Sequence, residues 1–151
     1  MKLAEALIDR ADLQKRAAQL EERIMRNLQV QEDEEPSEDP RALLQEFLDV
    51  TASLEALLPR IYRANLSATL PGGLSLTDAL TRRDLLDLRL KVLRRAATTA
   101  SERQTRYSNS EVRIVSVIAA RDLQKLADNL AKERRELETQ IQQANWLTEL
   151  P

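Results

Sequence analysis

The sequence PRALLQEFLDVTASLEALLPRIYRANLSA, residues 40–68, decides the fold class. Its apolar positions alternate between spacings of three and four, a pattern typical of a helix that packs along one seam of a bundle or coiled coil. These positions are Leu44, Phe47, Thr51, Leu54, Leu58, Ile61 and Asn65. Asp39 and Pro40 suit the N-cap and the first turn of this helix. Pro59 cannot donate a hydrogen bond to the carbonyl of Glu55, so we expect a kink or a break there.

Three further stretches show helical spacing of apolar residues, and they predict helices from about Lys2 to Leu28, from Thr77 to Arg103 and from Ala119 to Asn145. Leu28 and Leu126 belong to the apolar stripes expected for the first and last of these helices. The hydroxyl of Thr77 is the expected cap of the third helix.

The helices are joined by an acidic, proline-bearing segment at residues 30–40 and by LPGGLS at residues 70–75, which holds both glycines of the chain. Four helices of matched length with short connections predict an all-α fold. We expect either an antiparallel four-helix bundle or long helical hairpins, within a single domain at residues 1–151.

Residues 104–118, QTRYSNSEVRIVSVI, depart from the helical pattern because they combine turn formers with β-branched side chains. They predict either a short strand or hairpin near residues 106–117 or a packed crossover between two helices. A lone hairpin is only marginally stable in water, so a strand here would need packing or the edge of a partner. Tyr107, Val112 and Ile114 are therefore candidate interface residues.

The 151 residues include no cysteine and no histidine. This composition excludes thiol nucleophiles, disulfides, Ser-His-Asp triads, histidine-ligated zinc or haem, and a histidine pH switch. Aromatic residues make up 3% of the chain, which argues against a base-stacking surface. We expect no cofactor and no small-molecule ligand.

The net charge is −2, so no overall basic field favours nucleic acid as a partner. Residues 1–50 carry 13 acids and 7 bases, whereas residues 51–151 carry 12 acids and 16 bases. This asymmetry favours contact between the halves, within one chain or between subunits. We expect no transmembrane helix, no signal peptide and no membrane partner, and hence a cytoplasmic location.

Glu35, Glu38, Glu46 and Asp49 form an ExxE then ExxD pattern, which superficially suits Mg²⁺ bound by an all-helical pyrophosphatase. A metal-dependent phosphohydrolase is therefore one alternative function. The other interpretation is a solvated acidic loop, because such patterns arise by chance in a chain with 25 acids. This second interpretation predicts no metal site and no catalytic residues.

Two further residues are candidates for structural or interface roles. Asn65 is a polar residue on an apolar seam, where it can specify register or the number of partners. Trp146 is the single tryptophan and follows the last predicted helix, where it can cap the bundle or anchor a partner.

Four segments together resemble the septicolysin family, a set of small and predominantly helical bacterial proteins. They are KLAEALIDRADLQKR at residues 2–16, VQEDEEPSEDP at 30–40, RYSNSEVRIVS at 106–116, and the last helix with its tail at 123–150. The family name implies a thiol-activated cytolysin, but such toxins are large β-rich proteins that bear a cysteine. The resemblance implies no catalytic residues.

The seams, the charge asymmetry and the β-prone interruption favour a helical, homo-oligomeric protein that acts by protein–protein contact. The phosphohydrolase and the cytolysin are the alternatives.

Overall fold

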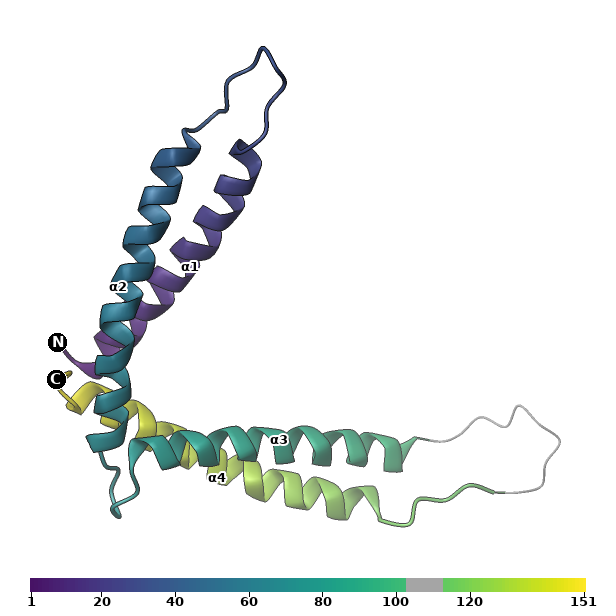
Figure 1. Cartoon of the computed structure of the whole chain (residues 1–151). Helices are drawn as coiled ribbons and strands as arrows, with labels where there is room; N and C mark the ends of the chain where they lie inside the picture. The colour runs from purple at the N-terminus through teal and green to yellow at the C-terminus, as the bar shows by residue number, and fades with distance from the viewer. Residues whose placement is uncertain (103–112) are drawn as a thin grey trace. The chain divides into compact units, whose positions relative to one another are not determined.

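A computed structural model describes residues 1–102 and 113–151 and contains four helices (Figure 1). These are α1 (Leu3–Asn27), α2 (Pro40–Ser67), α3 (Leu76–Ser101) and α4 (Ala120–Leu147). The prediction of an all-α fold is confirmed, since the described residues form no strand and only isolated bridge residues, among them Lys2 paired with Glu149. Residues 113–118 form no strand either, and the rest of the β-prone segment, including Tyr107 and Val112, lies outside the described residues.

The starts of α2 and α3 are set by capping side chains. The Asp39 carboxylate accepts the Arg41 N–H at 3.0 Å with Pro40 in the first turn, as the sequence predicts. The predicted cap of α3 is wrong, because Ser75 takes that place instead of Thr77. The Ser75 hydroxyl accepts the Asp78 N–H at 3.0 Å and donates to the Asp78 carboxylate at 2.7 Å. This reciprocal pair satisfies a free backbone donor and places an acid at the positive helix end.

The chain divides into two compact units. Unit 1 comprises Met1–Thr69 with Gln143–Pro151, and unit 2 comprises Leu70–Gln142. Unit 1 is built on the hairpin of α1 and α2, and unit 2 on the hairpin of α3 and most of α4. Helical hairpins were one of the two predicted arrangements, while the single domain at residues 1–151 stays a prediction.

In unit 1, the core of the α1–α2 hairpin is formed by Leu20 and Ile24 of α1 with Leu43 and Val50 of α2. At every second position of the predicted seam of α2, the buried residue is the one that precedes the predicted residue. The buried residues are Leu43, Val50, Leu57, Ile61 and Ala64, with Phe47 and Leu54 partly buried. This register buries Val50 and Ala64 in place of the predicted Thr51 and Asn65, and it therefore avoids the desolvation of two polar side chains.

Two other sequence expectations for unit 1 are corrected. α2 runs through Pro59 as one helix, so the break is absent, while the alternative expectation of a kink stays a prediction. Pro59 and Glu55 are both exposed, so water can reach the carbonyl that the proline leaves without a donor. At the end of α1, Asn27 is buried and the predicted stripe residue Leu28 is 53% exposed.

In unit 2, α3 and α4 pack through small and branched apolar residues, among them Leu86 and Leu90 of α3 and Leu123 and Ala127 of α4. The predicted stripe residue Leu126 is exposed, and its neighbour Ala127 is buried instead. Two ion pairs cross this hairpin, one from Arg82 to Glu133 and one from Arg134 to Asp87.

The two hairpins are sequence repeats of one another, which the periodicity of single helices does not reveal. Residues of α1 match α3 at an offset of 73, with these identities: Leu3 and Leu76, Ala6 and Ala79, Leu7 and Leu80, Arg10 and Arg83, Leu13 and Leu86, Arg16 and Arg89, Leu20 and Leu93. Residues of α2 and its tail match α4 at an offset of 80: Leu43 and Leu123, Leu57 and Leu137, Ile61 and Ile141, Ala64 and Ala144, Asn65 and Asn145, Leu70 and Leu150, Pro71 and Pro151.

Burial follows the same correspondence. Leu57, Ile61 and Ala64 are buried in the first repeat, as are Leu137, Ile141 and Ala144 in the second. The repeat is therefore structural as well as sequential, and it supplies a matched position for most helical residues of the chain.

Candidate functional site

The four acidic residues of the sequence-predicted metal site lie along unit 1, and two of them are held by arginines of α1. The Arg23 guanidinium donates to the Glu38 carboxylate from Nε at 3.0 Å and also from Nη2. Arg16 donates to Glu46 from Nε at 2.9 Å and from Nη2 at 2.6 Å. Paired in this way, these carboxylates already have strong cationic partners.

The hydrogen bonds from Arg23 lower the pKa of the Glu38 carboxyl below its ordinary value of 4.5, against a smaller opposing effect of desolvation. The same pairing raises the pKa of Arg23. Glu38 is thus held ionised by its partner.

The other two acidic candidates do not join a cluster. Glu35 is exposed in the connection between α1 and α2, and Asp49 accepts a hydrogen bond from Gln45 at 2.9 Å. Among the described residues, no three His, Cys, Asp or Glu residues are close enough to hold a metal ion together. Within residues 1–102 and 113–151, the four candidate carboxylates are therefore not gathered into one cluster.

A buried asparagine at the end of α1 anchors the same connection and was missed in the sequence. The Asn27 side chain donates to the Arg23 carbonyl at 2.8 Å and accepts the Glu38 N–H at 3.0 Å. Its spacing of three from Ile24 is the signal that could have placed it on the buried face. Asn27, Arg23 and Glu38 together fasten the chain before α2 to the end of α1.

The interface candidates that the structure describes lie at or near the surface. Asn65 is half-buried beside the fully buried Ala64, Trp146 is 55% exposed in the last turn of α4, and Ile114 is exposed ahead of α4. Their proposed roles in assembly stay predictions.

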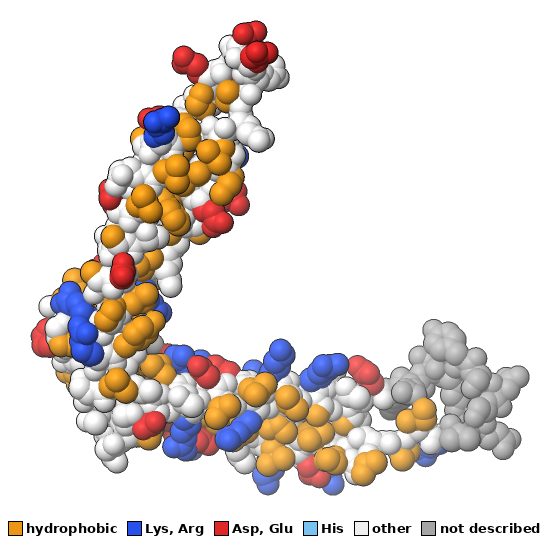
Figure 2. All heavy atoms as spheres, viewed as in Figure 1, with side chains coloured by type: hydrophobic (Ala, Val, Ile, Leu, Met, Phe, Trp, Pro, Cys, Tyr) orange, Lys and Arg blue, Asp and Glu red, His pale blue; other side chains and the backbone are white. Residues whose placement is uncertain are grey.

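The outward face of α2 carries large apolar side chains that unit 1 does not cover. Leu44, Leu48, Tyr62 and Leu66 are between 43 and 69% exposed and follow one another at intervals compatible with one side of the helix. Figure 2 shows hydrophobic side chains gathered along this hairpin. We call these four residues the α2 outer stripe.

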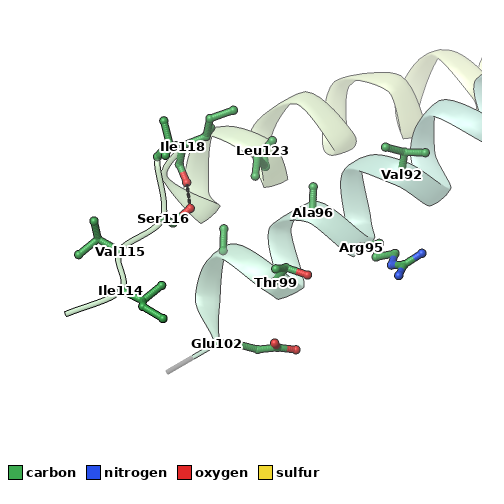
Figure 3. A pocket seen from close by; sticks show the side chains of 12 residues that line it. Val92, Arg95, Ala96, Thr99, Glu102, Ile114, Val115, Ser116, Ile118 and Leu123 are labelled. Carbon is green, nitrogen blue, oxygen red and sulfur yellow. Dashed lines mark hydrogen bonds between the residues drawn. The ribbon is translucent and has the colours of Figure 1, made fainter. Parts of the chain in front are cut away.

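A hollow of about 610 Å³ opens in unit 2 between the end of α3 and residues 114–118 (Figure 3). Ala96 and Thr99 of α3 lie on one side, and Ile114, Val115 and Ile118 contribute to the other. A hydrogen bond of 2.5 Å from the Ser116 hydroxyl to the Ile118 carbonyl lies within the bend before α4. The lining is largely apolar, so it offers few groups that would orient a polar ligand.

A second hollow, of about 600 Å³, lies in unit 1 between α1 and α2. Asp9, Asp12 and Leu13 line it from α1, and Ser53 and Leu57 line it from α2. Like the hollow in unit 2, which Arg95 and Glu102 also line, it combines apolar and charged side chains.

Comparisons with known proteins give relatives but no activity. A model of a family of unknown function, DUF6847, matches residues 10–150. A protein described as a functionally unknown conserved protein from Corynebacterium diphtheriae has a similar crystal structure, with a TM-score of 0.92 and 38% sequence identity over 100% of this chain and 99% of that one. No curated protein matches the chain. Among the described residues, no helix is both long and apolar enough to cross a membrane.

Proposed function

Because the chain belongs to DUF6847, a family of unknown function, we propose a function from its surfaces: it acts by protein–protein contact, and its first partner is a second copy of itself. The α2 outer stripe carries this proposal. A cytoplasmic location is part of it.

α2 is apolar on two faces, as is α3, where Leu85, Leu88 and Val92 are between 47 and 58% exposed. One face of α2 packs against α1, and the other presents the outer stripe to solvent. α2 has six charged residues in 28 positions, whereas α1 has ten in 25 and α4 has ten in 28. A second apolar face on one helix of a hairpin is typical of a surface that another chain covers.

The charges of the two units favour a second copy as the partner. Unit 1 has nine basic and fifteen acidic residues, a net charge of −6, and unit 2 has fourteen basic and ten acidic residues, a net charge of +4. Unit 1 of one copy and unit 2 of another therefore attract each other. Complementary charge of this kind accelerates association and disfavours like-charged partners.

The length of α2 is adequate for such an interface. A helix of 28 residues is about 42 Å long. A stable interface buries about 800 Å² on each partner, which a stripe of this length with its flanking residues can supply.

Light scattering after gel filtration tests the proposal at micromolar concentration. We expect a species larger than the 17.2 kDa of one chain. The double substitution Leu48→Glu with Leu66→Glu places two charges on the outer stripe and should reduce the mass to that of a monomer. Ile8→Glu is the matched control, because Ile8 is similarly exposed but lies on α1. A wild-type monomer would contradict the proposal, as would a double variant of unchanged mass.

A further inference from the structure

A second uncovered apolar face lies on α3, in unit 2. Leu85, Leu88 and Val92 are between 47 and 58% exposed, and their spacings of three and four place them on one side of the helix. Arg95 continues this spacing and is also exposed. We call these four residues the α3 outer face. It adjoins the hollow of unit 2, because Val92 and Arg95 also line that hollow (Figure 3).

The repeat shows that neither outer surface is needed to build a hairpin. At the offset of 73, the α3 outer face matches exposed polar residues of α1, namely Asp12, Lys15, Gln19 and Glu22. At the offset of 80, the α2 outer stripe matches three exposed polar residues and one aromatic residue of α4, namely Gln124, Asp128, Gln142 and Trp146. Equivalent helices therefore pack with mostly polar side chains at these places. The exposed apolar residues of α2 and α3 thus mark surfaces for contact with another chain.

Each outer surface includes one charged residue within its apolar spacing, and the two charges have opposite signs. Glu55 lies seven residues from both Leu48 and Tyr62, midway along the α2 outer stripe. Arg95 lies seven residues after Leu88 on α3. Both are exposed, and neither forms an ion pair with another residue in the part of the chain that the structure describes. The net charges of −6 on unit 1 and +4 on unit 2 have the same complementarity.

The position of Glu55 argues against contact between two α2 outer stripes. The stripe is symmetric about this residue, because Leu44 and Leu66 lie eleven residues from it and Leu48 and Tyr62 lie seven. Two stripes related by a twofold axis and fully in contact would therefore place Glu55 of one copy opposite Glu55 of the other. Like charges at the centre of an interface are unfavourable, whereas an arginine there is favourable.

We propose that the α2 outer stripe of one copy packs against the α3 outer face of a second copy, with Glu55 paired to Arg95. This inference rests on the self-association proposed above and names the surface that the stripe contacts. Each copy has one stripe and one face, so two copies that form the contact reciprocally close into a dimer with twofold symmetry. Such a dimer contains the contact twice, which brings the buried area toward the about 800 Å² that each partner of a stable complex contributes.

Charge reversal tests the pairing of Glu55 with Arg95. Glu55→Arg and Arg95→Glu each place like charges opposite one another, so each should weaken self-association at least about fivefold in sedimentation equilibrium. Both reversals in one chain restore an opposite pair and should return the dissociation constant to within about twofold of the wild type. Glu21→Arg is the control, because Glu21 is exposed on α1 outside both outer surfaces, and it should associate like the wild type.

A mixing experiment tests the contact itself. The variant Leu48→Glu with Leu66→Glu loses the stripe and keeps the α3 outer face, whereas Leu88→Glu with Val92→Glu loses the face and keeps the stripe. Each variant alone should be a monomer by light scattering and should retain its helical content by circular dichroism. An equimolar mixture should contain a species with the mass of two chains of 17.2 kDa, because one stripe and one face remain intact in that pair.

The results separate this inference from the proposed function. A monomeric wild type would overturn both. If the wild type associates and the variant Leu88→Glu with Val92→Glu keeps the same mass, the contact with α3 is wrong and the self-association stands. An Arg95→Glu variant that associates like the wild type would also overturn the contact, as would folded variants whose mixture stays monomeric.

Discussion

At the scale of single residues, the acids of unit 1 differ in whether an arginine reaches them. Glu38 and Glu46 each accept two donors of a guanidinium group, whereas Asp9 and Asp12 face a hollow. The first pair therefore fastens α1 to the segment around the start of α2.

Glu38 gives a prediction about the pH dependence of stability. Its pKa is lowered in the folded chain, so the folded state binds fewer protons there than the unfolded state does. The stabilisation is fully present above the ordinary value of 4.5 and is lost as the pH falls through the lowered pKa. Glu38→Gln should therefore lower the melting temperature at pH 7, and the difference from the wild type should shrink as the pH falls well below 4.5.

Circular dichroism melts across this pH range measure the effect. Glu35→Gln is the matched control, because Glu35 lies exposed in the same acidic connection, and it should follow the wild type throughout. A constant difference between Glu38→Gln and the wild type at all pH values would show that the carboxylate contributes by something other than its ionisation.

The acidic pattern placed several carboxylates near this connection, but it did not identify the side chains that pair with them. Glu38 and Glu46 are close in sequence, which makes them look like joint metal ligands. In the structure, Glu38 pairs with an arginine 15 residues earlier in the chain, and Glu46 pairs with one 30 residues earlier. Such pairs depend on the register between α1 and α2. Apolar periodicity in one helix does not specify that register.

At the scale of helices, the existence and approximate extent of all four elements follow from apolar spacing, although the cap of α3 lies at Ser75 and not at the expected Thr77. The register of α2 does not follow from it, because Leu43 with Leu44 and Leu57 with Leu58 offer two adjacent seams of similar hydrophobicity. Burial of Val50 and Ala64 instead of Thr51 and Asn65 favours the observed seam. Leu44 belongs to the seam that is not buried, and it is therefore part of the α2 outer stripe.

Pro59 gives a prediction at this scale. Pro59→Ala restores the N–H that can donate to the Glu55 carbonyl, and the surrounding helix is already continuous. Proline in a helix interior costs about 3 kcal/mol, part of which is offset by its lower entropy in the unfolded chain. The variant should therefore be more stable by about 2 kcal/mol in urea unfolding.

The repeat supplies the control for this experiment. Thr139 occupies the matching position of α4 and has the donor that Pro59 lacks. Thr139→Ala should change stability by about 0.5 kcal/mol or less, as expected for an exposed helix position. If Pro59→Ala destabilises the chain, the proline side chain is required by the packing of unit 1.

At the scale of the whole molecule, the repeat relates the joint between the hairpins to the ends of the chain. After α2, the Leu70 N–H donates to the Leu74 carbonyl at 2.8 Å, and the chain turns through Gly72 and Gly73. After α4, the matching Leu150 N–H donates to the Met1 carbonyl at 2.9 Å, and the Leu3 N–H donates to the Thr148 carbonyl at 2.9 Å. Met1 matches Leu74, so the hydrogen bond from Leu150 to Met1 is the equivalent of the one from Leu70 to Leu74, although Met1 and Leu150 are not joined by a short turn.

A circular permutant follows from this equivalence. Joining Pro151 to Met1 through two glycines and opening the chain between Gly72 and Gly73 keeps every helix intact. The two glycines have positive φ angles of 94° and 86°, so cutting between them removes a turn that other residues adopt only with strain. The added glycines supply the same freedom at the new joint. We expect the permutant to fold with unchanged helical content by circular dichroism.

A second permutant tests why the first one is expected to fold. It distinguishes the equivalence of the two joints from a general tolerance of the chain to new ends. Opening the chain between Leu54 and Glu55 with the same Pro151–Met1 connection cuts α2 in its middle, so the two fragments must recover its backbone hydrogen bonds without a covalent link. Its urea midpoint should fall well below that of the Gly72–Gly73 permutant. Equal midpoints would contradict the equivalence of the two joints, because the site of opening would then have no effect. With the expected difference, the hydrogen bond from Leu150 to Met1 acts as a turn that lacks its two glycines and their peptide bonds, and the two joints are interchangeable.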